Sequence, residues 1–196
     1  EELSYRRNIV TLENTLLFSK KQKAKFVYIS TDYVFDGENG PYKESDKKNP
    51  ISIYGRHKSL AENILNESKI ENLILRITNV YGKETQKKNF INQLINNKSF
   101  RFRLPSWQYS TPVCAEDIGR ALELLIMDNK KGIYHLSSIE YLSRVDLVRI
   151  FNDYSARKVE FEVLSEKENT QLAKRPKLGG LINFKFKSEY PNFLFT

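Results

Sequence analysis

Two stretches of the chain decide its fold, Ser30-Thr31-Asp32-Tyr33-Val34-Phe35-Asp36-Gly37 and Tyr54-Gly55-Arg56-His57-Lys58. The first follows Lys25-Phe26-Val27-Tyr28-Ile29, a short apolar run that is typical of a buried β-strand. The second opens a helix expected from about residue 52 to 68, after a loop rich in turn signals. A strand, a loop and a helix are therefore expected in succession.

The pattern continues on both sides of these stretches. An amphipathic helix is expected over residues 3 to 22, and a second buried strand over Asn72–Ile77. The further expected elements are helices near 86–97, 115–127 and 143–154 and strands over 132–136 and 159–163, with an irregular segment around Pro105 and Pro112. Strands that alternate with helices indicate an α/β fold, in which a parallel sheet carries helices on its faces.

The composition narrows the class of protein. The 196 residues are 40% hydrophobic and 29% charged, which is ordinary for a globular chain. No apolar run approaches the roughly 20 residues that span a bilayer, and no signal peptide is recognisable, so we expect no membrane and a cytoplasmic location. One cysteine and two histidines argue against a disulfide or a metal site. The net charge of +8 is scattered and has no nucleic-acid motif, which favours anionic substrates over DNA or RNA.

Tyr54 and Lys58 suggest a chemistry. They lie four residues apart, so both fall on one face of the expected helix. An ammonium beside a phenol favours the phenolate, and Lys58 is therefore expected to lower the pKa of Tyr54 from its usual value of about 10. Such a tyrosine is a general acid for a carbonyl oxygen that becomes an alkoxide. Thr31, at the carboxyl end of a strand, is placed to hydrogen-bond the same oxygen.

These residues resemble the extended short-chain dehydrogenase/reductases, and within them the dTDP-4-dehydrorhamnose reductase branch. That branch also includes the regulatory β subunit of methionine adenosyltransferase. The likeness covers nearly the whole chain, and its most specific part runs from residue 30 to 58. It extends to Pro41-Tyr42, Glu44, Asp46, Pro50, Arg76 to Gly82, Gln108, Ser110-Thr111-Pro112, Gly132 to His135 and Ala173-Lys174-Arg175-Pro176.

The resemblance implies a Rossmann-type fold, a nicotinamide cofactor (NADPH or NADH) and a catalytic set. Tyr54 would donate the proton and contact the cofactor. Lys58 would be its electrostatic partner and a ligand of the cofactor ribose, and Thr31 the third catalytic residue. Ile29 would line the cofactor site with its backbone.

The substrate implied by the resemblance is a 4-keto-6-deoxy nucleotide sugar, reduced for surface polysaccharide synthesis. Thr31 and Asp32 would contact this substrate. Asn79 is a third substrate-binding candidate, because it stands where reductases of the branch usually carry a tryptophan that packs on the substrate.

The glycine-rich turn that holds a dinucleotide's pyrophosphate does not occur in these 196 residues. We therefore expect the N-terminal β-α-β part of the Rossmann-type sheet to be missing from this chain. Residues 1–82 would be the C-terminal part of the NAD(P)-binding domain with the catalytic residues. Residues 83–196 would be mainly a small substrate lobe, centred on about 83–112 and 155–178, with 113–154 returning to the Rossmann core.

Other interpretations stay open. A nucleotide-sugar epimerase or dehydratase of the same superfamily would share Tyr54 and Lys58. A non-catalytic regulatory subunit, resembling the methionine adenosyltransferase β subunit, would keep the fold without turnover. A parallel sheet that lacks strands also exposes an edge that favours pairing, so we expect either a homo-oligomer or a true chain that is longer than these 196 residues.

Overall fold

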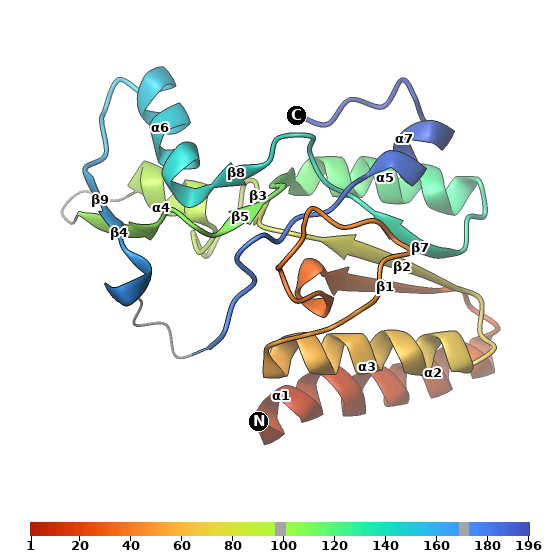
Figure 1. Cartoon of the computed structure of the whole chain (residues 1–196). Helices are drawn as coiled ribbons and strands as arrows, with labels where there is room; N and C mark the ends of the chain where they lie inside the picture. Colours follow the sequence, from red (N-terminus) through yellow and green to blue (C-terminus); the bar gives the residue numbers. More distant parts are fainter. Residues whose placement is uncertain (97–100, 169–172) are drawn as a thin grey trace.

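The computed structural model describes residues 1–96, 101–168 and 173–196. Its central element is a parallel sheet with the strand order β1-β2-β7 (Figure 1). The strands are β1 (Phe26–Thr31), β2 (Asn72–Ile77) and β7 (Gly132–His135). The register sets Thr31 beside Ile77 and Arg76 beside His135, so the carboxyl ends of the strands meet at one edge. The predicted parallel sheet is confirmed.

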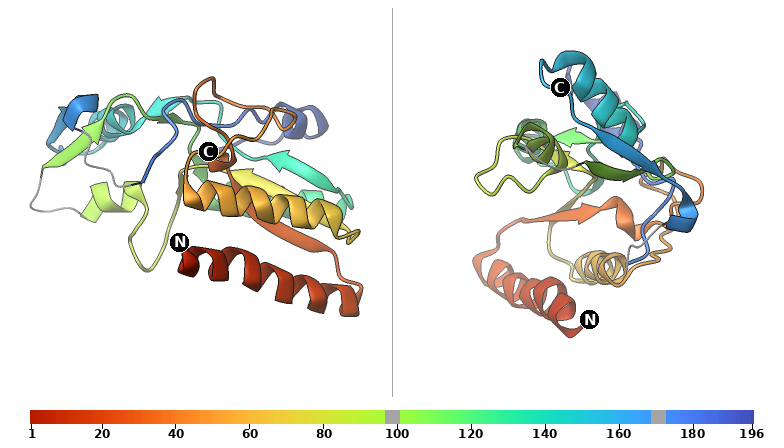
Figure 2. Two further views of the ribbon diagram at one scale, coloured as in Figure 1. Left: turned by 60° about the horizontal axis from the view of Figure 1, so that its bottom comes forward. Right: turned by 90° about the vertical axis from the view of Figure 1, so that its left-hand side faces the viewer.

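Helices cover both faces of this sheet (Figures 1 and 2). One face carries α1 (Glu2–Tyr5), a π-helical turn (Arg6–Val10), α2 (Thr11–Gln22) and α3 (Ile53–Glu67). The other face carries α5 (Ala115–Met127) and the short α7 (Phe184–Glu189). The first three segments form one continuous helix, as predicted, which ends at Lys23 in a left-handed conformation.

Strand β2 shows why helices must cover both faces of the sheet. Leu73 and Leu75 pack in a buried cluster with Ala121 and Leu125 of α5, whereas Ile74 packs on the opposite side with α2 and α3. Successive strand residues point to opposite faces, so an apolar run such as this one stays buried only when both faces are covered.

A second buried cluster lies beside the main sheet. It is built from α4 (Phe90–Asn96), α6 (Arg144–Tyr154), β4 (Phe102–Pro105) and β9 (Phe161–Leu164), and the two strands pair in parallel. Leu94, Val148 and Val159 are among its buried members.

Residues 144–154 were predicted to belong to the Rossmann core, but α6 packs in the second cluster. The division of the chain into domains otherwise stays a prediction. The predicted helix 86–97 begins at Phe90. Its last residue lies outside the described residues, together with the lobe residues 98–100 and 169–172.

Short strands connect the main sheet to the second buried cluster. β3 (Val80–Tyr81) pairs in parallel with β6 (Val113–Cys114), and β5 (Tyr109–Ser110) pairs antiparallel with β8 (Leu142–Ser143). The segment around Pro105 and Pro112, expected to be irregular, therefore contains parts of three small sheets.

Residues 176–182, here named the crossing segment, run between the loop after β1 and the short strands. Leu178 N donates to Gly37 O at 2.8 Å, and Ile182 N donates to Tyr42 O at 2.7 Å. Leu181 N donates to Thr111 Oγ1 at 2.9 Å. These hydrogen bonds hold the crossing segment against the loop after β1 and against Thr111.

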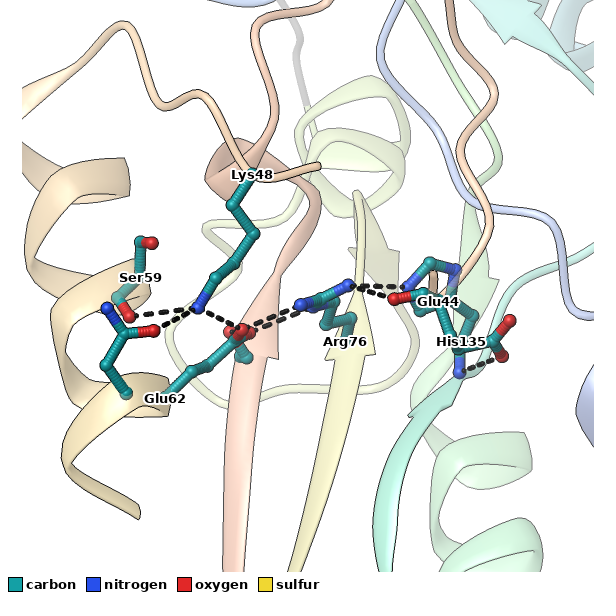
Figure 3. A network of polar contacts seen from close by, with 8 residues as sticks. Glu44, Lys48, Ser59, Glu62, Arg76 and His135 are labelled. Carbon is teal, nitrogen blue, oxygen red and sulfur yellow. Dashed lines mark hydrogen bonds and ion pairs between the residues drawn. The ribbon is translucent and has the colours of Figure 1, made fainter. Parts of the chain in front are cut away.

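A buried ion pair joins α3 to the centre of the sheet (Figure 3). Arg76 of β2 is 1% exposed and Glu62 of α3 is 0% exposed. The guanidinium donates from Nε to Glu62 Oε1 at 2.9 Å and from Nη2 to Oε2 at 2.7 Å. Ser30 Oγ also donates to this carboxylate at 2.5 Å, and Lys48 Nζ lies 3.2 Å from it. These partners hold the pKa of Glu62 below its usual value, against the effect of burial.

The network continues to the next strand. Arg76 Nη1 lies 3.3 Å from His135 Nε2, and His135 Nδ1 lies 3.1 Å from Tyr42 O. Burial, together with the Arg76 charge, lowers the pKa of His135 to about 3. The imidazole is therefore neutral, accepts from arginine and donates to the Tyr42 carbonyl. The Glu44 carboxylate accepts from His135 N at 2.9 Å, which ties the loop after β1 to β7.

Glu62→Gln is expected to lower the free energy of unfolding by about 3–5 kcal/mol, because it leaves the Arg76 charge buried without its counter-ion. Chemical denaturation measures the loss. Glu67→Gln, on the exposed last turn of the same helix, is the matched control and should change stability by less than about 0.5 kcal/mol. Equal small effects of both substitutions would contradict the role given to the ion pair.

The low pKa of His135 predicts acid sensitivity. An unfolded histidine takes up a proton below pH 6.5, whereas the folded one stays neutral to about pH 3. Stability contributed by this site is therefore fully present above pH 6.5 and falls by up to about 1.4 kcal/mol per pH unit below it. Unfolding free energies from pH 7 to 5 should show a shallower fall in His135→Asn than in the parent. Identical slopes would show that the histidine is not responsible.

Candidate active site

The carboxyl end of β1 carries two hydroxyl residues, Ser30 and Thr31, which point to opposite faces of the sheet. Ser30 turns toward α3 and bonds Glu62 in the buried network. Thr31 turns the other way and caps the short 3₁₀ helix Asp32–Val34, accepting a hydrogen bond from Tyr33 N at 3.2 Å. Thr31, and not Ser30, is therefore placed at the candidate site.

The start of α3 brings Tyr54 to this strand end. Ser52 caps the helix by accepting a hydrogen bond from Gly55 N at 3.0 Å. Gly55 then packs so closely on the 3₁₀ turn that an added Cβ would lie 2.1 Å from Tyr33 O. This approach sets the Tyr54 ring edge-on to the Tyr33 ring, at a centroid distance of 5.9 Å. Tyr54 remains 44% exposed.

The pKa of Tyr54 is raised, mainly by burial and then by the negative charge of Asp32, while a hydrogen bond with Thr31 opposes the rise. This corrects the sequence-based expectation that Lys58 lowers it. Lys58 does not act on the phenol in this way, because its ammonium is directed to β1. The tyrosine therefore carries its proton at neutral pH.

Lys58 reaches the backbone of the strand instead. Its Nζ donates to Ile29 O at 2.6 Å and stands 4.2 Å from the centre of the Tyr28 ring. Burial lowers the pKa of Lys58 to about 8, and the nearby Glu62 opposes this effect. An ammonium has three N–H donors, and one carbonyl is its only hydrogen-bond acceptor within the part of the chain that the structure describes.

Asp32 and Asn79 line a pocket beside this group, and Asp32 accepts a hydrogen bond from Thr31 Oγ1 at 3.2 Å. Both line a small pocket of about 30 Å³, together with Tyr33, Gln108 and Arg175. Asn79 has a left-handed backbone (φ 40°) and donates from its side-chain amide to Ser110 Oγ. The structure thus gathers Thr31, Tyr54, Lys58 and Ile29 along β1 and α3, with Asp32 and Asn79 on the adjoining pocket wall.

Sequence reasoning missed Arg144, which follows the capping residue of α6. Arg144 lines both the small pocket and a neighbouring one of about 560 Å³ with apolar walls, which include Phe90, Ile91 and Leu147. Burial lowers the pKa of Arg144, and the charge of Arg175 lowers it further. Neither arginine pairs with a carboxylate among residues 1–96, 101–168 and 173–196. No sequence motif marks a single arginine after a serine cap.

The two histidines are structural. His57 is buried and lies 2.9 Å from Ser4 Oγ on the preceding helix. His135 belongs to the buried network. The described residues include no group of three or more His, Cys, Asp or Glu that could hold a metal ion. They also include no helix long and apolar enough to cross a bilayer.

Comparison with known proteins identifies the family. The family model described as the RmlD substrate binding domain matches residues 1–192. The chain belongs to this family. Its relatives include the spore coat polysaccharide biosynthesis protein SpsK of Bacillus subtilis (strain 168), 33% identical over 127 residues, which are 63% of this chain and 44% of SpsK. The methionine adenosyltransferase 2 subunit beta of Bos taurus is 29% identical over 133 residues, 63% of this chain and 40% of that protein.

Solved structures agree with this assignment to the RmlD family. The dTDP-4-dehydrorhamnose reductase of Bacillus anthracis str. Ames, crystallised in complex with NADP, superposes with a TM-score of 0.86 at 28% identity. The match covers 95% of this chain and 66% of that one. The likeness confirms the predicted Rossmann-type class. The RmlD-family chain matches less than half the length of the two curated relatives named above.

Gly55→Ala is expected to destabilise the chain by about 1–3 kcal/mol, because the new methyl group meets the Tyr33 carbonyl and must push the start of α3 away. Gly119→Ala is the matched control. Gly119 lies on the exposed side of α5 with nothing within 4 Å of an added Cβ, so alanine should stabilise the helix by about 0.5–1 kcal/mol. Thermal unfolding compares the two, and effects of the same sign would contradict the close-packing argument.

Proposed function

We propose that this RmlD-family chain carries the catalytic and substrate-binding part of a cytoplasmic, NADPH- or NADH-dependent reductase. Its substrate would be a 4-keto-6-deoxy nucleotide sugar for surface polysaccharide synthesis. The observation that carries the proposal is the meeting of Thr31, Tyr54 and Lys58 at the carboxyl end of β1. Ligands of open parallel sheets bind at this edge.

The residues fit the ribose end of a nicotinamide nucleotide. Lys58 is held by Ile29 O and has further N–H donors to offer, which suits vicinal hydroxyl groups. The sequence contains no glycine-rich turn for the pyrophosphate. Ile29, Tyr54 and Lys58 would therefore hold the ribose and nicotinamide side. The reduced nicotinamide, when bound, supplies a hydride.

Tyr54 would protonate the substrate oxygen. Its raised pKa keeps the phenol protonated at neutral pH, so the proton is available when negative charge develops on a ketone oxygen. Thr31 lies beside the phenol and helps to hold it. The Lys58 ammonium stands at the same strand end and favours negative charge in the site.

Arg144 and Arg175 favour a substrate with two negative charges. The two guanidinium groups line the same small pocket without a carboxylate ion-pair partner among the described residues, so an anion between them, such as a diphosphate, would stabilise both. The 560 Å³ pocket continues from Arg144 and offers apolar walls for a nucleobase. Asn79 lines both pockets and would contact the sugar or the phosphate.

Turnover is tested by following NADPH absorbance with dTDP-4-dehydrorhamnose. The parent chain should consume the cofactor, and Tyr54→Phe should lower kcat about 10²–10⁴-fold, because the proton donor is lost. Lys58→Ala should weaken NADPH binding measured by calorimetry, whereas Lys69→Ala, an exposed lysine just beyond α3, should not.

Substrate class is tested by calorimetric titration with dTDP. Arg144→Gln and Arg175→Gln should each raise the Kd about tenfold or more, because each removes a charge-assisted hydrogen bond. Arg149→Gln, an exposed arginine on α6, is the control. Nucleotide binding without turnover would favour the regulatory-subunit interpretation. Sugar conversion without net cofactor consumption would favour an epimerase or dehydratase.

Self-association remains part of the proposal. Strand β1 lies at the edge of the sheet and pairs only with β2 within the described part of the chain. Next to it, α2 exposes Leu17 and Phe18 at 62% and 63%. An unpaired edge beside exposed apolar side chains favours pairing with a second copy.

A further inference from the structure

Tyr28 of β1 lies on the face of the sheet that α2 and α3 cover. The strand residues two positions away, Phe26 and Ser30, point to the same face. Phe26 belongs to the buried cluster under these helices, and Ser30 bonds Glu62 of α3. The Tyr28 side chain packs against this cluster, which also includes Leu65 of α3. This packing restrains the position of the aromatic ring.

The Lys58 ammonium meets the face of this ring. Lys58 Nζ lies 4.2 Å from the ring centroid and donates to Ile29 O at 2.6 Å. A cation within about 6 Å of the centre of an aromatic face is attracted by the negative charge of the π system. The two contacts come from adjacent residues of one strand. Together they define the position of the ammonium and the direction of one of its N–H groups.

The Lys58 ammonium has no carboxylate ion-pair partner among residues 1–96, 101–168 and 173–196. The charge of Glu62 acts on it, but the Glu62 oxygens are bonded by Arg76 and Ser30. Burial lowers the pKa of Lys58 to about 8. The charged form therefore needs a further source of stabilisation near neutral pH, and the Tyr28 ring is in contact with it.

The Tyr28 phenol is neutral near neutral pH. Burial raises its pKa, and the charges of Tyr54 and Glu62 raise it further. Tyr28 Oη makes no hydrogen bond within the part of the chain that the structure describes. The face of the ring, and not an ionised or hydrogen-bonded oxygen, is thus the part of Tyr28 that acts on Lys58.

We propose that Tyr28 is a positioning residue, whose ring face keeps the Lys58 ammonium charged and directed at Ile29 O. The role of Lys58 as a ligand of the cofactor ribose rests on the proposed function, but the contact between ring and ammonium does not. An ammonium offers three N–H donors, one more than a neutral amine. Tyr28 would therefore determine up to which pH Lys58 can bond Ile29 O and two ribose hydroxyl groups at once.

The titratable and charged groups around Lys58 come from several elements. On the side of the N-terminal helix, the neighbouring His57 faces Ser4 and Tyr5. The other groups are Tyr28 of β1, Tyr54 and Glu62 of α3, Arg76 of β2, and Lys48 of the loop before α3. The test variants change only Tyr28, so a change in the Lys58 titration reports the effect of its ring.

Tyr28→Leu and Tyr28→Phe test the proposal without cofactor or substrate. Leucine keeps an apolar side chain but removes the ring face, so the midpoint of the Lys58 titration should fall by about 0.4–1.5 pH units. Phenylalanine keeps the ring face and should leave the midpoint unchanged. Tyr154→Leu, which removes a 90% exposed tyrosine of α6, is the matched control and should have no effect.

The midpoint is measured by NMR of the chain with isotope-labelled lysine, and Lys58→Met identifies the Lys58 signal. Lys185 provides an internal reference, because its Nζ lies 3.8 Å from the centroid of the Tyr134 ring and its signal should follow the same curve in every Tyr28 variant. An unchanged or raised Lys58 midpoint in Tyr28→Leu, or an equal fall in Tyr28→Phe, would overturn the proposal.

Fluorinated phenylalanines at position 28 cover the case in which Tyr28→Leu does not fold. Successive fluorine atoms withdraw negative charge from the ring face, while the shape of the side chain stays nearly the same. The Lys58 midpoint should therefore fall stepwise from phenylalanine to its mono-, di- and trifluorinated forms. A constant midpoint along this series would overturn the proposal.

Calorimetric titration with NADPH separates this proposal from the proposed function. If Lys58 binds the ribose, the NADPH affinity should fall as the pH rises through the Lys58 midpoint, and the fall should begin at lower pH in Tyr28→Leu. A folded chain that binds no NADPH at any pH would contradict the proposed function. The Lys58 titration would still decide the role of Tyr28.

Discussion

The rest of the structure depends on the placement of a positive charge inside a parallel sheet. Arg76 occupies the middle strand, where an apolar residue would otherwise stand, and it is only 1% exposed. A charge in this position is tolerated only when counter-ions and acceptors surround it completely. Glu62 from α3, His135 from β7 and the Glu44 carbonyl at 3.4 Å provide them from three separate parts of the chain.

This constraint reaches the candidate site through α3. Glu62 fixes the helix relative to the sheet one turn beyond Lys58 and two turns beyond Tyr54, so both side chains meet β1 at a defined height. Gly55 then fixes the helix start against the 3₁₀ turn. The network is not itself catalytic in the proposal, yet it determines which atoms of the strand end Tyr54 and Lys58 can contact.

The sequence predicts those features that depend on local pattern. Apolar runs and turn signals located β1, β2, β7 and the long helices, and the spacing of Tyr54 and Lys58 placed both on one helix. The pKa shifts and the hydrogen-bond partners of the charged side chains could not be predicted from local pattern. The direction of the Tyr54 pKa shift depends on burial and on Asp32, and Lys58 turns to a backbone carbonyl that no spacing rule reveals. Arg144 was missed because its neighbours come from distant segments. The two-residue strands β3, β5, β6 and β8 are too short to show a period.

The crossing segment has a consequence for how the site comes into being. The bond from Gly180 N to Asp32 joins residues 148 positions apart. Contacts of such long sequence separation form late, because a large loop must close before they contribute. During synthesis β1, α3 and β2 can assemble while the Asp32 carboxylate still faces water. The candidate reaction centre would therefore mature after the scaffold that carries it, because a nascent chain cannot complete the site before the crossing segment has been synthesised.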